Sequence, residues 1–186
     1  MSRIIQIGMG RNRVKGYNDP VTLIIFGITE EKIMTDRITK SIIVQGDVSD
    51  IYQLWANFEN FPHFMENIES VTKTGSGLSH WVMKGPLGQK IEWDAETTRM
   101  EENKRIGWNS KDNSDLTTSG QVTFNPLPSN QVEVTITLQY QPPAGKLGEA
   151  VAHLFDNPER KLEEDLQRFK AYAERISTTS RMGMGR

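Results

Sequence analysis

The segment 131–141 is the feature that most limits how this chain can fold. Its residues alternate between apolar and polar without a fault, and the apolar set is Val132, Val134, Ile136, Leu138 and Tyr140. Alternation with a period of two is typical of a strand in an antiparallel sheet with one dry face and one wet face. Because a dry face must be covered, the sequence has to supply an element that packs against it.

An amphipathic helix is predicted shortly after this strand. Asn157 and Pro158 occupy favourable N-cap and first-turn positions. The apolar stripe that follows is Leu162, Leu166, Phe169, Ala173 and Ile176. Acidic residues gather early in the segment and basic residues late, which suits the helix dipole. A helix over 158–176 would be roughly 28 Å long, so we expect it to cross the dry face, after a shorter helix over 147–155.

Six further segments are predicted to be strands, because each is rich in β-branched or aromatic residues and ends at turn residues. They are 38–45, 68–73, 80–84, 90–99, 105–110 and 120–125, and a last turn is expected over 126–130. Short connections require antiparallel neighbours. The predicted architecture is therefore α+β, a curved antiparallel sheet of six to seven strands around a long C-terminal helix.

A short helix is predicted between the first two strands. Asp47 or Ser49 can serve as its N-cap, and Pro62 is expected to stop it. Its apolar positions follow the helical spacing and are Ile51, Leu54, Trp55 and Phe58. The residues after it, 61–65, are expected to form an aromatic-rich loop or a single turn.

One domain over 38–177 is predicted, with an N-terminal extension over 1–37 and a flexible tail over 178–186. Within the extension, 21–28 is apolar and β-branched enough for an extra strand. The first 20 residues are basic, which suits either a mobile tail or a peripheral contact with an acidic membrane surface or partner. The sequence leaves the oligomeric state open.

Composition excludes several classes of function. The chain has no cysteine, which excludes thiolate catalysis and cysteine-bound zinc, and its formal charge of −2 argues against nucleic acid as a partner. His63, His80 and His153 lie too far apart for a metal motif, so we expect neither a metal nor a cofactor. Without an apolar run of about 18 residues or a secretory signal, we predict no transmembrane segment and a cytoplasmic location.

Bulky side chains on the apolar side of the strands predict a cavity. Trp81, Trp93 and Trp108 all fall on this side, and one helix cannot cover a strongly curved sheet of this size completely. Taken one at a time, these side chains fit an ordinary core. The architecture as a whole favours a chamber lined by aromatic and aliphatic groups, which suits an apolar ligand.

The chain also resembles the START-like polyketide cyclase/dehydrase and lipid-transport superfamily (SRPBCC), whose fold is the helix-grip, or Bet v 1-like, fold. The resemblance is carried by Ser41–Val44, Tyr52–Met65, Gly120–Leu127 and the long final helix, and spans about 38–176. It implies an apolar cavity between sheet and C-terminal helix. The residues expected to line it and to contact a ligand are Trp81, Met83, Trp93, Trp108, Phe124, Ile136, Tyr140, Leu166 and Phe169.

Signs of catalysis are sparse. Glu92, Asp94 and Glu96 alternate along one predicted strand, but on the side opposite Trp93, so we expect them in solvent. Asp94 would become an internal general base if a bulge reversed the register, and His80 is the other residue to test. We therefore predict no catalytic residues.

Three functions stay open at this point. A carrier or sensor of an apolar small molecule, such as a lipid, isoprenoid or quinone, is favoured because the cavity side offers few polar groups. The first alternative is a polyketide cyclase or dehydratase. The second is a protein-binding module that uses 21–28 or 61–65 as its contact surface.

Overall fold

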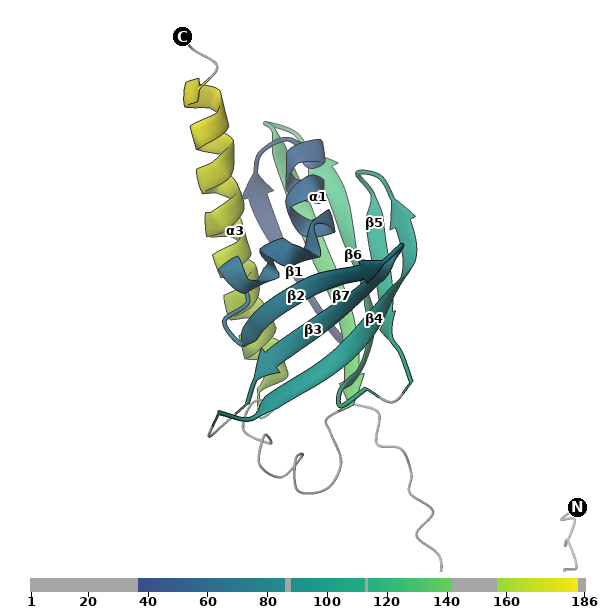
Figure 1. Cartoon of the computed structure of the whole chain (residues 1–186). Helices are drawn as coiled ribbons and strands as arrows, with labels where there is room; N and C mark the ends of the chain where they lie inside the picture. Colours follow the sequence, from purple (N-terminus) through teal and green to yellow (C-terminus); the bar gives the residue numbers. More distant parts are fainter. Residues whose placement is uncertain (1–36, 86–87, 113, 142–156, 184–186) are drawn as a thin grey trace, which may run out of the picture. The chain divides into compact units, whose positions relative to one another are not determined.

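The computed structural model describes residues 37–85, 88–112, 114–141 and 157–183. A seven-stranded antiparallel sheet in the order β1-β7-β6-β5-β4-β3-β2 curves around one side of a long helix (Figure 1). The predicted α+β helix-grip fold is confirmed. Its elements are β1 (Ile38–Gln45), α1 (Val48–Ala56), the 3₁₀ helix η1 (Phe58–His63), β2 (Ile68–Gly75), β3 (Leu78–Lys84), β4 (Lys90–Glu101), β5 (Arg105–Ser110), β6 (Thr117–Leu127), β7 (Gln131–Gln141) and α3 (Pro158–Gly183).

Helix α1 begins as predicted but ends earlier. The Asp47 carboxylate caps it by accepting a 2.8 Å hydrogen bond from the Ser49 N–H. The helix stops at Ala56, well before Pro62, and the Asn60 side chain donates to the Leu54 carbonyl of its last turn. Pro62 lies inside η1 and therefore does not end α1. Phe58, predicted on the α1 stripe, is instead the first residue of η1.

Strand β6 is longer at both ends than predicted. It starts at Thr117 and continues through Pro126, which was expected in a turn and instead pairs with Val132 of β7. The pairing of β6 with β5 ends at Thr123. A proline is tolerated beyond that point because one side of the strand has no neighbour whose ladder needs its N–H.

Helix α3 runs beside the edge strand β1 (Figure 1). Side chains of α3 form hydrogen bonds with backbone groups of this strand. Lys170 Nζ donates to the Ile43 carbonyl at 2.5 Å, and Glu174 accepts from the Gln45 N–H at 2.9 Å. These contacts satisfy backbone groups that a further strand would otherwise use. At its start, the Asn157 side chain accepts from the Arg160 N–H, which confirms the predicted cap.

The far end of α3 corrects a boundary. The helix continues to Gly183, past the end expected near Ile176, so 178–183 belong to the helix and not to a tail. The predicted strand over 21–28, the helix over 147–155 and the last residues of the tail lie outside the described residues.

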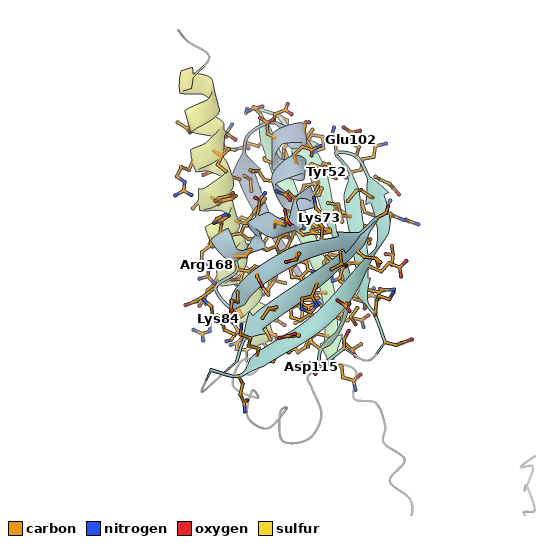
Figure 2. The ribbon with its side chains drawn as sticks, in the orientation of Figure 1. Tyr52, Lys73, Lys84, Glu102, Asp115 and Arg168 are labelled. Carbon is orange, nitrogen blue, oxygen red and sulfur yellow. The ribbon has the colours of Figure 1, made fainter. Side chains whose placement is uncertain are left out.

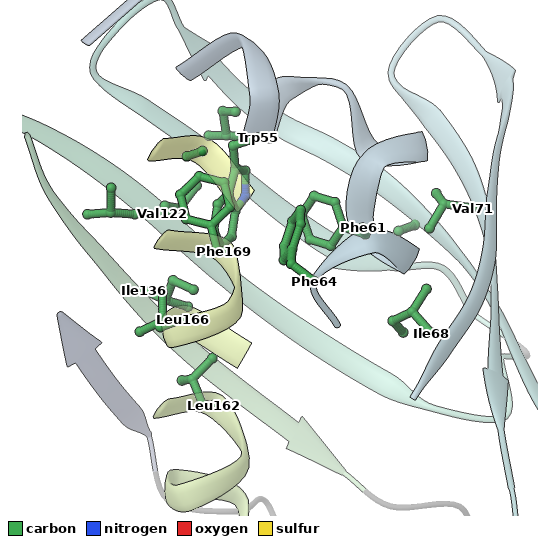
Figure 3. Close-up of a cluster of buried hydrophobic side chains, with 14 of the residues drawn as sticks. Trp55, Phe61, Phe64, Ile68, Val71, Val122, Ile136, Leu162, Leu166 and Phe169 are labelled. Atoms are coloured by element: carbon green, nitrogen blue, oxygen red, sulfur yellow. The ribbon is translucent and has the colours of Figure 1, made fainter. Parts of the chain in front are cut away.

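One end of the interior is a solid aromatic core, which we call the filled region: Tyr52, Trp55, Phe64, Phe124 and Phe169. Trp55 and Phe169 meet edge to face with ring centroids 4.8 Å apart, and Phe64 lies 5.0 Å from Phe169 (Figure 3). All five are at most 4% exposed. Burial and the charge of Glu102, near the same end, raise the pKa of the Tyr52 phenol (Figure 2). Here side chains of α1, the η1 segment and α3 pack directly on one another and on the sheet, and Trp55 lies at the border with the cavity described below.

Candidate functional site

The other end of the interior, which we call the hollow region, holds a cavity of about 210 Å³. It lies between the sheet and the first turns of α3, which contribute Pro158, Lys161, Leu162 and Asp165. Helix α1 and the η1–β2 segment close it on one side. Their lining residues are Trp55, Phe58, Phe61, Met65, Asn67 and Ile68. The sheet supplies most of the rest: Ser79, Trp81, Met83, Trp93, Ala95, Glu96, Thr97, Trp108, Thr118, Ile136, Leu138 and Tyr140. Leu116, just before β6, completes the lining.

Two stacked indoles form one wall of this cavity. Trp81 of β3 pairs directly with Trp93 of β4, and their rings lie 5.7 Å apart and nearly parallel. Phe61 meets Trp81 edge to face at 5.0 Å, and Trp81 Nε1 donates to Ser79 Oγ at 2.9 Å. Because these contacts fix the ring planes, the wall is a rigid aromatic surface on which a flat apolar molecule could stack.

The Trp108 side chain packs against Gly120, which leaves room for the indole because it has no side chain. Trp108 pairs with Gly120 across β5 and β6, and a Cβ built on Gly120 would lie 2.7 Å from the Trp108 ring and 2.5 Å from the Thr137 carbonyl oxygen. The indole thus lies over Gly120, where any side chain would push it inward. The glycine therefore sets how far Trp108 projects into the cavity.

Six of the nine residues predicted to line the cavity do so: Trp81, Met83, Trp93, Trp108, Ile136 and Tyr140. The other three, Phe124, Leu166 and Phe169, are buried but do not border it. Leu166 and Phe169 project from later turns of α3 than Leu162, toward the filled region (Figure 3). The apolar stripe of α3 meets two different environments: Leu162 borders the cavity, whereas Phe169 packs against Trp55 in the filled region. Contact of any of the nine with a ligand stays a prediction.

His80 and Asp94, the two residues raised for catalysis, lie away from the cavity. His80 Nδ1 lies 2.9 Å from Asp94 Oδ1, and its Nε2 lies 3.5 Å from Glu92. The Asp94 side chain is 59% exposed. The bulge in β4 falls between Thr97 and Arg99, after Asp94, and so does not reverse its direction. This cluster is a polar patch on the outer face of the sheet, as the alternation predicted.

Asp165 is a carboxylate at the cavity that is not among the predicted site residues. It lines the cavity from α3, and its side chain is only 21% exposed. Arg168 Nη2 donates to Asp165 Oδ1 at 2.5 Å, and the Glu66 N–H also donates to this carboxylate. Burial raises the pKa of Asp165, against the lowering effect of Arg168 and of the Glu66 N–H. Its acidic neighbours had suggested a helix-dipole role, yet its spacing of three from Leu162 and four from Phe169 places it on the inward stripe.

The rest of the polar lining includes two charged side chains, Lys161 and Glu96, and several neutral ones. Glu96 is exposed, as predicted, although it also borders the cavity. Ser79 and Thr118 are 3% and 7% exposed, and Ser79, having accepted from Trp81, can still donate its own O–H. Burial raises the pKa of the Tyr140 phenol above its ordinary value of 10.0, so this group is protonated at neutral pH, as any tyrosine is. The interior therefore offers hydroxyl groups at a few points of an apolar surface.

Other kinds of site find no support in this part of the molecule. Across the described ranges, no group of three or more His, Cys, Asp or Glu side chains is placed to hold a metal ion. In the same ranges, no helix is both long and apolar enough to cross a membrane.

A curved antiparallel sheet closed by a C-terminal helix over an apolar cavity defines the START-like, helix-grip class of protein. The sequence model of one family, polyketide cyclase / dehydrase and lipid transport, matches residues 44–167. The chain belongs to this family. A relative from Streptomyces lincolnensis, described as an uncharacterized 17.2 kDa protein, is 30% identical over 138 residues, which cover 74% of this chain and 89% of the relative.

Solved structures share the fold. A protein of Deinococcus radiodurans matches with a TM-score of 0.61 and 28% identity, over 75% of this chain and 98% of its own. The Zhui aromatase/cyclase of Streptomyces matches with a TM-score of 0.61 and 16% identity, over 76% and 94%. A START superfamily protein of Mycobacterium smegmatis gives 0.59 and 14%, over 75% and 98%. At 16% and 14% identity, the latter two are similar in fold alone.

Proposed function

We propose that this protein binds a compact apolar small molecule in the hollow region and acts as its carrier or sensor. The observation that carries the proposal is the cavity itself, walled by the Trp81–Trp93 stack and by aliphatic side chains. Apolar, largely preformed pockets with a few polar groups are the usual form of small-molecule sites. Membership in a family described by both lipid transport and polyketide chemistry supports the same class of ligand.

The size of the cavity narrows the ligand. Its volume of about 210 Å³ lies below the usual range of about 300–1,000 Å³ for drug-sized ligands. An apolar cavity of about 150 Å³ is known to hold benzene. We therefore favour a molecule of one or two rings, or the ring of a quinone or a short isoprenoid, over a long-chain lipid.

A cyclase or dehydratase is the second candidate, and Asp165 is the observation that favours it. Such an enzyme needs a group that can exchange protons with a bound substrate. The candidates from the sequence, His80 and Asp94, lie on the outer face, whereas Asp165 borders the cavity and has a raised pKa. Binding has the stronger support, because the aromatic walls of the cavity suit an apolar ligand directly. Catalysis would also require Asp165 to exchange a proton with that ligand.

The protein-binding alternative and the cytoplasmic location stay predictions. The first depends partly on 21–28, outside the described residues. Its other proposed contact, 61–65, contributes Phe61 and Met65 to the cavity lining, which favours a role in the pocket for these two side chains.

Two measurements test the proposal. Protein purified from its native host and extracted for mass spectrometry should release a compact apolar compound at a fixed ratio. Calorimetric titration of the purified protein with naphthalene should give one site. Ala95 is 4% exposed and borders the cavity, so Ala95→Leu should fill part of it and weaken binding, whereas Ala171→Leu on the exposed side of α3 should not.

The contradicting results are equally definite. An empty protein that binds no naphthalene would refute the proposal. Equal binding by the Ala95→Leu and Ala171→Leu variants would place any binding outside the cavity, and the proposal would again fail.

A further inference from the structure

Asp165 lies where α3 meets the segment between η1 and β2. Arg168 Nε donates to the Phe64 carbonyl at 3.1 Å, and its Nη2 lies 3.7 Å from Glu66. Arg168 therefore connects α3 to this segment while it also donates to Asp165. Arg168 and the Glu66 N–H hold the Asp165 carboxylate, and the same residue borders the cavity. Its position is preorganised before any ligand enters.

This carboxylate has acceptor capacity left over. An ionised carboxylate offers about four acceptor positions. Among the described residues, Arg168 and the Glu66 N–H are the donors to Asp165. Burial of unused acceptor positions is costly unless a donor reaches them, so a ligand that fills the cavity without offering a donor would leave them unsatisfied.

The charges around Asp165 indicate what kind of donor suits it. Arg168 balances the negative charge of Asp165 at close range, and Lys161 borders the cavity one helical turn earlier. Two further acidic groups are near: Glu66 lies 3.7 Å from Arg168, and Glu96 borders the cavity. Because Asp165 is already paired with Arg168, a cationic ligand would lose its hydration in the cavity without gaining an unpaired negative charge. A neutral hydroxyl group satisfies the free acceptor positions without adding charge.

We propose that Asp165 is the polar anchor of the cavity, and that the ligand is a compact aromatic molecule whose hydroxyl group donates to its carboxylate. The proposal rests on the proposed binding function and names a residue and a ligand group for it. The ring of the ligand lies against the Trp81–Trp93 wall, and its hydroxyl group points toward α3. A hydrogen bond to an ionised acceptor is stronger than one between neutral groups, which makes this contact a basis for selectivity.

Two probes that differ in one donor test the anchor. The hydroxyl group of 2-naphthol can donate, whereas 2-methoxynaphthalene has the same rings and cannot. At neutral pH, calorimetric titration of the full chain should show 2-naphthol binding about tenfold more tightly, in line with one charge-assisted hydrogen bond. Asp165→Asn should reduce this preference and Asp165→Leu should abolish it, with little change for 2-methoxynaphthalene.

A control variant separates the anchor from a general effect of charge. Glu163 is exposed two residues earlier on the same helix, so Glu163→Gln removes one negative charge away from the cavity and should keep the full preference. Thermal unfolding of each variant checks that it is folded. If Asp165→Leu does not fold, Asp165→Asn decides the matter alone.

The outcomes distinguish the anchor from the binding function. Equal affinity of the wild-type protein for both probes, or an unchanged preference in the Asp165 variants, would overturn the anchor and leave the binding function standing. Binding of neither probe, nor of naphthalene, would overturn both.

Discussion

The filled and hollow regions lie under the same helix and against the same sheet, yet one is solid and the other is not. In the filled region, α1 and the η1 segment insert Trp55 and Phe64 between α3 and the sheet, and Phe169 closes against them. In the hollow region, Leu162 of α3 and the stacked indoles of Trp81 and Trp93 border a common empty space. A helix over a curved sheet makes a complete core only where a third layer fills the gap. The cavity is therefore set by how far α1 and η1 reach.

The largest difference between the regions should appear in stability. Phe169→Ala removes a ring that is 1% exposed and packed on two aromatic neighbours, so it should lower the free energy of unfolding by about 3–5 kcal/mol. Leu138→Ala, in the cavity wall, should cost less because its side chain already borders empty space. Urea unfolding measures both. An equal or larger loss for Leu138→Ala would contradict the distinction between the regions.

The next effect concerns the place that Gly120 leaves for Trp108. Gly120→Ala should force the indole inward and cost about 1–3 kcal/mol, because the new methyl group would overlap with Trp108 and with the Thr137 carbonyl. It should also weaken naphthalene binding. Gly75→Ala is the matched control, since its methyl group would make ordinary contacts with Leu78. If Gly120→Ala is as harmless as the control, the glycine does not position Trp108.

The two helix caps should have similar effects on stability and different effects on binding. Asp47→Ala removes the cap of α1 and Asn157→Ala that of α3, and each should cost about 1 kcal/mol. Pro158 and Lys161, in the first turns of α3, line the cavity, so Asn157→Ala should also weaken naphthalene binding, while Asp47→Ala should not. Calorimetric titration of both variants with naphthalene measures the difference. Weaker binding by Asp47→Ala than by Asn157→Ala would contradict the position of the cavity at the start of α3.

The smallest effect is a dependence of stability on pH. The pKa of Asp165 in the folded protein is raised above its ordinary value of 3.8. The folded state therefore binds this proton more readily than the unfolded state, so the contribution of Asp165 to stability improves as the pH falls through the raised pKa toward 3.8. The stability of the wild-type protein relative to Asp165→Asn should rise over this range. Urea unfolding at several pH values measures it, and a relative stability that falls would show the opposite shift.

The main strands and the long helix could be predicted from the sequence, because alternation and helix caps depend only on residues close together in the chain. Strand β7 follows from faultless alternation over 131–141, and the start of α3 follows from its cap at Asn157. The outward position of Asp94 also followed from alternation, because the bulge in β4 comes after it. The side of the sheet to which a side chain belongs needs no knowledge of the rest of the fold.

What failed depends on contacts between distant segments. The segment around Pro126 has the residue types of a turn. Pro126 can lie in β6 because β5 stops pairing with β6 before it. Phe124 and Phe169 have the same pattern as cavity-lining residues, and only the reach of α1 and η1 places them in the filled region. Asp165 was hidden among exposed acids, although its helical spacing from Leu162 was visible.

The central claim is that the hollow region, and not the filled region, receives the ligand. Isotope-filtered nuclear Overhauser spectra of the protein bound to 2-naphthol test it most directly. We predict contacts from the bound rings to the indole protons of Trp81 and Trp93 and to the methyl groups of Leu138, and none to Phe124 or Phe169. Contacts to Phe124 and Phe169, or contacts confined to residues outside the cavity, would contradict the account.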